Sequence, residues 1–185
     1  MRRGTNWWMV AVIAVAVLVS GVGLLIVASI VVFGLSFGDD DNLGLHDLDA
    51  AGAAEGMELR RIGIPEVFAF EEMTVVRQFT GADFYRGRYS ATGGFEAAKA
   101  ALAQENPDFP VLRSVTCDDE IVDRDFTQDP QFHCDASTRL EVSTRTLDGA
   151  DVLTDNYSGT PPDCETVLLA RNGDRVELFV LSQGH

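Results

Sequence analysis

The chain has 185 residues, of which 29 are acidic and 14 are basic, so its formal net charge at pH 7 is −15. All the acidic residues lie after residue 38, together with 12 of the basic ones, and this part of the chain carries −17. A domain this acidic repels nucleic acid, so we exclude nucleic acid as a partner. The length of the chain leaves room for one ordinary domain.

The first predicted element is a transmembrane helix over residues 9–35. Met9 to Phe33 form a run of 25 residues without a charge, rich in Val, Ile, Leu and Ala. At ~1.5 Å per residue, this run exceeds the ~30 Å hydrocarbon core. Arg2 and Arg3 precede it and Asp39 to Asp41 follow it, so the positive-inside rule places the N-terminus in the cytoplasm and the C-terminal domain outside. We therefore predict a cell-membrane protein whose first partner is the lipid bilayer.

The alternative for this run is a cleaved signal peptide. Such a peptide has an apolar region of ~7 to 15 residues followed by a small-x-small cleavage site. The nearest candidate, Ala28-Ser29-Ile30, lies inside the apolar stretch, which continues to Phe33. A retained signal anchor is therefore favoured.

Arginine outnumbers lysine by 13 to 1, a bias that we attribute to a GC-rich bacterial genome.

Residues 36–61 are predicted to form an acidic flexible linker. They are rich in Asp, Ala and Gly, and their leucines are too sparse to build a core. The alanines would allow a short helix around Leu48 to Leu59, but Gly52 and Gly56 weaken it.

A β-hairpin is predicted next, with strands at Met73–Phe79 and Phe84–Ala91. The sequence Thr80-Gly81-Ala82-Asp83 between them is a turn signal. A candidate ligand face lies on the second strand, where a basic pair beside aromatic rings could hold an anion. Its residues are Tyr85, Arg86, Arg88 and Tyr89.

Alternation in this strand separates the two tyrosines from the two arginines, which point to opposite faces. The other interpretation is that the arginines pair with carboxylates of this acidic domain.

The clearest predicted helix runs from Phe95 to Gln104 and stops at Asn106-Pro107. Phe95, Ala98 and Leu102 form one stripe, which we expect to pack on a sheet, with Glu96 and Lys99 on the solvent side.

Four further strands are predicted in the second half. A strand at Val111–Cys117 precedes an irregular acidic stretch that continues to about His133. Arg139 to Leu147 alternate as a strand with one wet face. The last two strands, 167–171 and 174–181, flank Asn172-Gly173, which predicts a type I′ turn.

This turn predicts the register of the final hairpin. Its pairs are Arg171 with Asp174, Leu169 with Val176, and Val167 with Leu178.

The order of these elements predicts an α+β fold, with one helix packed on a mainly antiparallel sheet. The predicted organisation is a cytoplasmic N-terminus (1–8), a transmembrane helix (9–35), an acidic flexible linker (36–61) and an extracytoplasmic α+β domain (62–185).

Three cysteines follow the anchor, and outside the cytoplasm two of them are expected to pair. Cys117 with Cys134 is favoured because this pair closes a short loop through the least structured region. Cys164 is the rival partner for either.

Metal and cofactor sites are not predicted. A zinc site would combine the cysteines with His133, but zinc ligands usually come as close pairs, and His133 and Cys134 are adjacent. Oxygen ligands at residues 123, 125, 127 and 129 resemble the start of a calcium loop, yet Gln128 replaces its glycine and Cys134 its glutamate.

Two functional hypotheses follow. The first is a non-enzymatic binding or accessory module of the bacterial cell envelope, with another envelope protein as its partner. The second is an envelope enzyme or small-ligand sensor with a site on the sheet. No catalytic residues are assigned, because His46, His133 and His185 lie in the linker, beside a cysteine and at the chain end.

Overall fold

The computed structural model describes residues 43–184 except 128, 148, 150 and 152–162. The predicted cytoplasmic segment and the predicted transmembrane helix lie outside these residues. No helix within the described part of the chain is long and apolar enough to cross a membrane.

The described residues form one seven-stranded antiparallel sheet with three helices. The strand order is β1-β2-β3-β7-β6-β5-β4, so the last strand lies between β3 and β6. The prediction of an α+β fold with a mainly antiparallel sheet is confirmed, with three helices in place of one. The elements are β1 (Gly44–Leu48), α2 (Ala50–Leu59), β2 (Phe68–Arg77), β3 (Phe84–Ala91), α3 (Phe95–Glu105), β4 (Arg113–Val115), α4 (Glu120–Asp125), β5 (Arg139–Thr146), β6 (Cys164–Asn172) and β7 (Arg175–Gln183).

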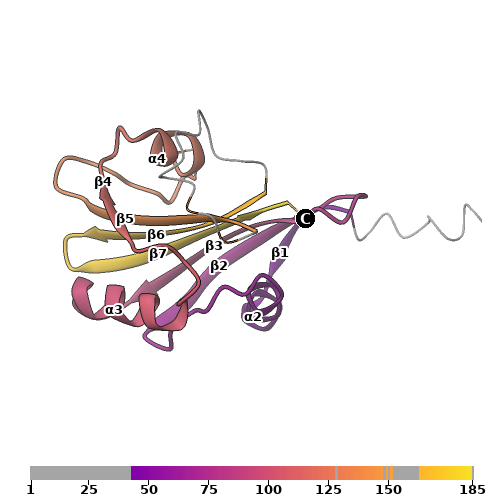
Figure 1. Cartoon of the computed structure of the whole chain (residues 1–185), viewed down its shortest axis with the longest axis horizontal. Coiled ribbons are helices and arrows are strands. Elements are labelled where there is room, and N and C mark those ends of the chain that lie inside the picture. The colour runs from indigo at the N-terminus through magenta and orange to yellow at the C-terminus, as the bar shows by residue number, and fades with distance from the viewer. Residues whose placement is uncertain (1–42, 128, 148, 150, 152–162, 185) are drawn as a thin grey trace, which may run out of the picture. The chain divides into compact units, whose positions relative to one another are not determined.

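Both faces of the sheet are covered (Figure 1). Helices α2 and α3 lie on one side, which we call the helical face, and α4 lies on the other, which we call the loop face. Two apolar clusters correspond to these faces, and β6 and β7 contribute alternate residues to each. Leu169 and Leu178 belong to the helical face, whereas Leu168 and Phe179 belong to the loop face.

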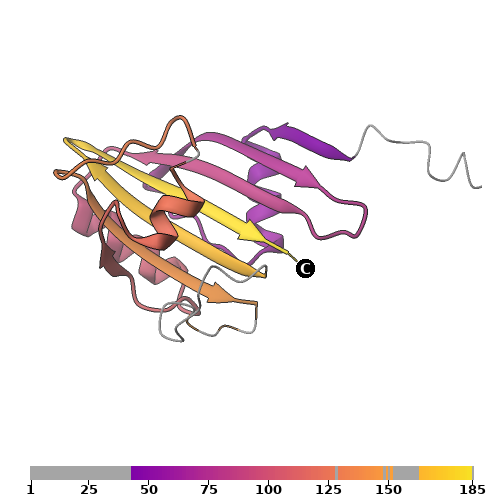
Figure 2. The same cartoon turned by 90° about the horizontal axis from the view of Figure 1, so that it is seen from above.

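The expected flexible spacer is structured from Leu43 onward. Gly44–Leu48 pair with β2 as an edge strand, visible beside β2 in Figure 2. Ala50–Leu59 form α2, whose N-terminus is capped by the side chain of Asp49. The helix forms despite its glycines because Ala53, Gly56 and Met57 are buried on the domain. The spacer therefore does not extend to Arg61.

The first hairpin and the main helix are confirmed. β2 pairs with β3, although it begins earlier than predicted, at Phe68. α3 extends over Phe95–Glu105 and buries the predicted stripe. Lys99 does not simply face solvent, because it forms an ion pair with Glu141, which is 1% exposed.

The predicted wet face of β5 is wrong. Glu141, Ser143 and Arg145 are all buried, and each has a polar partner. The two faces of β5 alternate as predicted, but polar side chains in a strand can be buried when the fold supplies a hydrogen bond or an ion pair.

Two segments between α3 and β5 also differ from expectation. The strand predicted over Val111–Cys117 is shorter, since β4 covers only Arg113–Val115. The acidic stretch is not wholly irregular, because it contains α4, which buries Ile121 and Val122 on the loop face.

The final hairpin forms, but its register differs by two positions from the prediction. Asn172 pairs with Arg175 and Leu169 pairs with Leu178, so the two turn residues are Gly173 and Asp174. Gly173 has φ +62° and Asp174 does not have a positive φ, the pattern of a type II′ turn. Because side chains alternate with period two, this shift changes the partners but leaves every side chain on its expected face.

Candidate functional site

The structure separates the four residues of the predicted ligand face. Tyr85 and Tyr89 are buried in the helical-face cluster. Arg86 and Arg88 project from the opposite side of β3, so the two tyrosines and the two arginines do not line one site. The strand alternation already implied this separation.

The two arginines have partners on the loop face. Arg88 bonds to Glu72 at 2.9 Å and to Glu177 at 3.2 Å, carboxylates on the strands to either side. Arg86 donates to the carbonyl oxygen of Asp125 at 3.2 Å, at the end of α4. The contacts of Arg88 correspond to the alternative interpretation, in which the arginines pair with carboxylates of the acidic domain, whereas Arg86 binds a main-chain carbonyl. A cavity of about 210 Å³ remains beside them, lined also by Asp129, Pro130 and Gln131.

A different polar site lies at the C-terminal end of α2. The helix ends in a Schellman motif, in which Ile62 N–H donates to the Met57 carbonyl at 2.9 Å and Arg61 N–H to the Glu58 carbonyl at 3.0 Å. Arg61 therefore occupies the left-handed position usually taken by glycine, with φ +54°. Its side chain is exposed.

Arg145 fastens this helix end to the sheet. Its guanidinium bonds to Glu165 on β6 at 2.7–2.8 Å and donates to the Arg61 carbonyl at 3.0 Å. It also lies over the ring of Phe109, 4.0 Å from the centroid. Arg145 and Glu165 are both buried, so each offsets the desolvation cost of the other.

Arg60 is also buried, but its hydrogen-bond acceptors are neutral. It donates to the main-chain carbonyls of Gly184 and, at 2.7 Å, of Asp83. Its guanidinium lies 5.1 Å from the ring centroid of Tyr85. Burial lowers the pKa of Arg60, while the ring and the nearby carboxylates of Glu165 and Asp83 oppose this effect.

One more buried polar group lies at this end of the sheet. Ser182 pairs with both Tyr85 and Glu165 in register and is fully buried. Its hydroxyl has no hydrogen-bond partner among the described residues.

Arg60, Arg61, Arg145 and Glu165 line a cavity of about 520 Å³, which we call the arginine pocket. The volume lies within the ~300–1,000 Å³ typical of small-ligand sites. The lining residues are Leu59, Arg60, Arg61, Asp108, Arg145, Leu147, Gly149 and Glu165.

Sequence reasoning missed the arginine pocket for identifiable reasons. Arg60 and Arg61 were assigned to the linker, and Arg145 was assigned to a wet face. The alternation in β5 placed Arg145 on the side opposite to Leu140 and Val142, but no local pattern could bring it to α2, which lies some 85 residues earlier.

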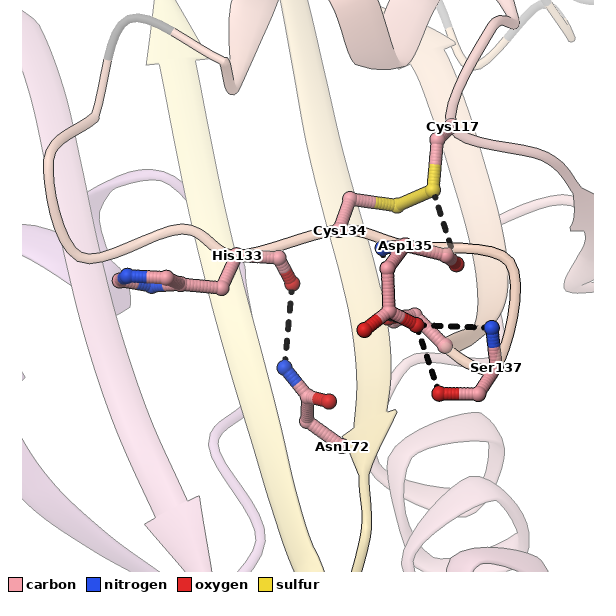
Figure 3. The surroundings of a disulfide bond; sticks show 7 residues. Cys117, His133, Cys134, Asp135, Ser137 and Asn172 are labelled. Atoms are coloured by element: carbon pink, nitrogen blue, oxygen red, sulfur yellow. Dashed lines mark hydrogen bonds between the residues drawn. A yellow bond between two sulfur atoms is a disulfide. The ribbon is translucent and has the colours of Figure 1, made fainter.

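The disulfide region covers the loop face (Figure 3). Cys117 and Cys134, the pair favoured from sequence, are joined, with their Cα atoms 5.8 Å apart. Asn172 on β6 donates to the His133 carbonyl at 3.2 Å, which ties the loop to the final hairpin. Asp135 accepts hydrogen bonds from the amide and hydroxyl of Ser137 at 2.7 and 2.6 Å, and these bonds lower its pKa.

Cys164 is the free cysteine of the described residues, and it is buried under the same face. Burial, together with the negative charge of Asp125, raises the pKa of its thiol to about 12. At neutral pH the thiol is therefore protonated and poorly nucleophilic.

The residues named for the zinc and calcium alternatives have other roles in the described part of the chain. Cys117 and Cys134 form the disulfide. Asp123 and Asp125 lie in α4 instead of an extended loop. Asp125 also contacts Arg124 at 3.0 Å. The described residues contain no cluster of three or more His, Cys, Asp or Glu side chains arranged to hold a metal ion.

Comparison with protein-family models, with curated protein sequences and with solved structures finds no match for this chain. Its chemistry is therefore inferred from its own residues.

Proposed function

We propose that the protein is a single-pass membrane protein whose C-terminal domain lies outside the cytoplasm and acts as a non-enzymatic binding or accessory module of the bacterial cell envelope. The observation that carries the location is the Cys117–Cys134 disulfide. Disulfides persist in oxidising compartments and are rare in the cytoplasm.

The charge distribution along the chain supports the same orientation. Arg2 and Arg3 precede the uncharged run of residues 9–33, and Asp39 to Asp41 follow it. Positive residues remain on the cytoplasmic side of a spanning helix. Since the described domain begins at Leu43, a short segment would connect it to a helix that ends at residue 35.

Binding is favoured over catalysis by the chemistry of the arginine pocket. Three of its charged groups are guanidiniums, which keep their protons at all ordinary pH values. Such groups hold anions and do not act as general acids or bases near neutral pH. Glu165 is engaged by Arg145 in a buried ion pair.

A topology experiment on the full-length protein tests the location. Alkaline phosphatase, which folds only after export, is fused after His185, and a green fluorescent protein fusion is made in parallel. Mass spectrometry of the protein from its own membranes measures the oxidation of the cysteines. We expect phosphatase activity and an oxidised Cys117–Cys134 pair. A fusion active only in the cytoplasm, or free thiols at both positions, would contradict the proposal.

The binding role is tested by cross-linking intact cells and purifying the full-length protein with whatever is attached to it. We expect a stoichiometric envelope partner that is absent when the anchor alone, residues 1–42, is purified. Recovery of the same proteins with the anchor alone would remove the support for a role of the domain.

A further inference from the structure

Arg61 combines backbone strain with an unengaged side chain. A left-handed conformation is unfavourable for an L-residue, and glycine at this position of a Schellman motif avoids that strain. Arg61 adopts φ +54° nonetheless. Among the described residues, no hydrogen bond or ion pair engages its guanidinium, which lines the arginine pocket. Folding alone would favour glycine here, so the side chain is the feature that needs an explanation.

The charges in the pocket do not cancel. Glu165 is neutralised by Arg145 at 2.7 Å. Among the described residues, the remaining lining charges are Arg60, Arg61 and the exposed Asp108, which sum to +1 in a chain whose net charge is −15. The acceptors of Arg60 are main-chain carbonyls, so no carboxylate of the described residues bonds directly to this buried cation. An anion in the pocket would supply a negative charge beside the guanidinium of Arg60.

Two of the residues that line the pocket are exposed leucines. Leu59 is 71% exposed and Leu147 is 40% exposed, and both belong to the lining. Apolar side chains beside convergent guanidiniums suit a ligand that has a charged head and an apolar body. Guanidinium binds planar or tetrahedral oxyanions through paired hydrogen bonds.

We propose that the arginine pocket binds a small amphipathic anion, with its carboxylate or phosphate held by Arg60 and Arg61 and its apolar body against Leu59 and Leu147. This inference deepens the proposed binding role and rests on it, but it does not depend on the membrane topology. The buried pair Arg145–Glu165 positions the carbonyl of Arg61, and with it the end of α2.

The test uses purified full-length protein in nanodiscs of zwitterionic lipid, titrated by isothermal calorimetry with benzoate, phenyl phosphate, inorganic phosphate and neutral benzamide at constant ionic strength. We expect saturable binding of benzoate or phenyl phosphate, at least tenfold tighter than benzamide and inorganic phosphate. The stronger of the two organic anions identifies the head group. Equal affinity for benzamide, or no saturable binding of either organic anion, would overturn the proposal.

Variants separate binding from folding. Arg61→Gly relieves the left-handed strain, so we expect a higher unfolding temperature together with at least tenfold weaker anion binding. Arg61→Gln weakens binding similarly. Arg77→Gln removes one exposed charge from β2, outside the pocket, and should leave the affinity within twofold. Equal losses of anion affinity in Arg61→Gln and Arg77→Gln would indicate only general charge attraction and would contradict the proposed site.

If the anions fail to bind while the topology and cross-linking experiments give their expected results, the anion class is wrong and the binding module stands. If those experiments fail while benzoate or phenyl phosphate binds, the pocket stands without the envelope role.

Discussion

The two faces of the sheet are covered in different ways. On the helical face, α2 and α3 have 10 and 11 residues and bury regular apolar positions. On the loop face, α4 has 6 residues, and the chain around it contributes Phe126 and Phe132 to a cluster with Phe179. The ring centroids of Phe132 and Phe179 lie 5.3 Å apart.

This difference shows what an irregular segment needs in order to stay packed on a sheet. A helix satisfies most of its own backbone groups, so packing of one stripe is enough to hold it. An irregular segment has the same kind of entropy cost for each ordered residue but lacks that internal bonding, so it needs other local ties. The loop face has such ties in the Cys117–Cys134 disulfide, the Asn172 bond to His133 and the Arg86 bond to Asp125.

The largest effect is expected from removing the disulfide. In the chain-entropy model, a loop of this length contributes about 3 kcal/mol to the free energy of unfolding. The double substitution Cys117→Ser with Cys134→Ser should lower stability by about that amount and speed amide exchange first in α4. Denaturant unfolding and hydrogen-exchange mass spectrometry of the full-length protein measure these two effects.

Leu102→Ala is the matched change on the helical face. Leu102 is 1% exposed, and truncating a buried leucine costs about 3 kcal/mol. In this variant, amide hydrogen exchange should become faster in α3, whereas the amides of α4 should remain protected until the whole domain unfolds. If both variants loosened both faces equally, the distinction between the two covers would be wrong.

The next effect concerns the two glycines of α2. A Cβ on Gly56 would lie 2.8 Å from the ring of Tyr85, whereas on Gly52 its nearest neighbour would be 3.4 Å away. We expect Gly56→Ala to lower the free energy of unfolding by about 2 kcal/mol through overpacking, despite the better helix propensity of alanine.

Gly52→Ala is the control, and it should raise stability by about 0.5 kcal/mol through propensity alone. Thermal unfolding followed by circular dichroism compares the two variants. A gain in both would mean that α2 does not pack against Tyr85 as closely as described.

The last expected effect appears only at alkaline pH, where stability is lost as one buried group on each face ionises. Burial raises the pKa of Tyr89 on the helical face and of Cys164 on the loop face to about 12 each. In the unfolded chain these groups ionise near pH 10 and pH 8.5, respectively. Between those values and pH 12 the unfolded state binds fewer protons, so the stabilisation present at lower pH is lost as the pH rises.

Tyr89→Phe and Cys164→Ala remove the two contributions separately. The unfolding free energy of each variant should fall less steeply than that of the natural chain between pH 9 and 11. Chemical denaturation at a series of pH values measures these slopes. An unchanged slope in Cys164→Ala would mean that the thiol is not shielded by the loop face.

Much of the fold followed from local patterns, because local patterns report local forces. Period-two alternation located β3 and β5, and the stripe of Phe95, Ala98 and Leu102 located α3 together with its buried side. Each of these depends on residues a few positions apart, which the chain geometry keeps together.

The candidate site could not be predicted in the same way. The proposed ligand face joined two tyrosines to two arginines that the sheet holds on opposite sides. The arginine pocket instead joins α2 to β5 and β6, across separations that no periodicity describes.

By itself, the sequence determined the α+β class, the faces of the central strands and the favoured cysteine pair, since apolar periodicity and loop closure are properties of the chain. Tertiary structure alone decided that residues 44–59 join the domain, that Gly56 is needed where propensity disfavours it, and that Arg145 is buried with Glu165. The physical reason is that burial of polar groups and close packing depend on partners distant in the chain, and only the folded sheet brings those partners together.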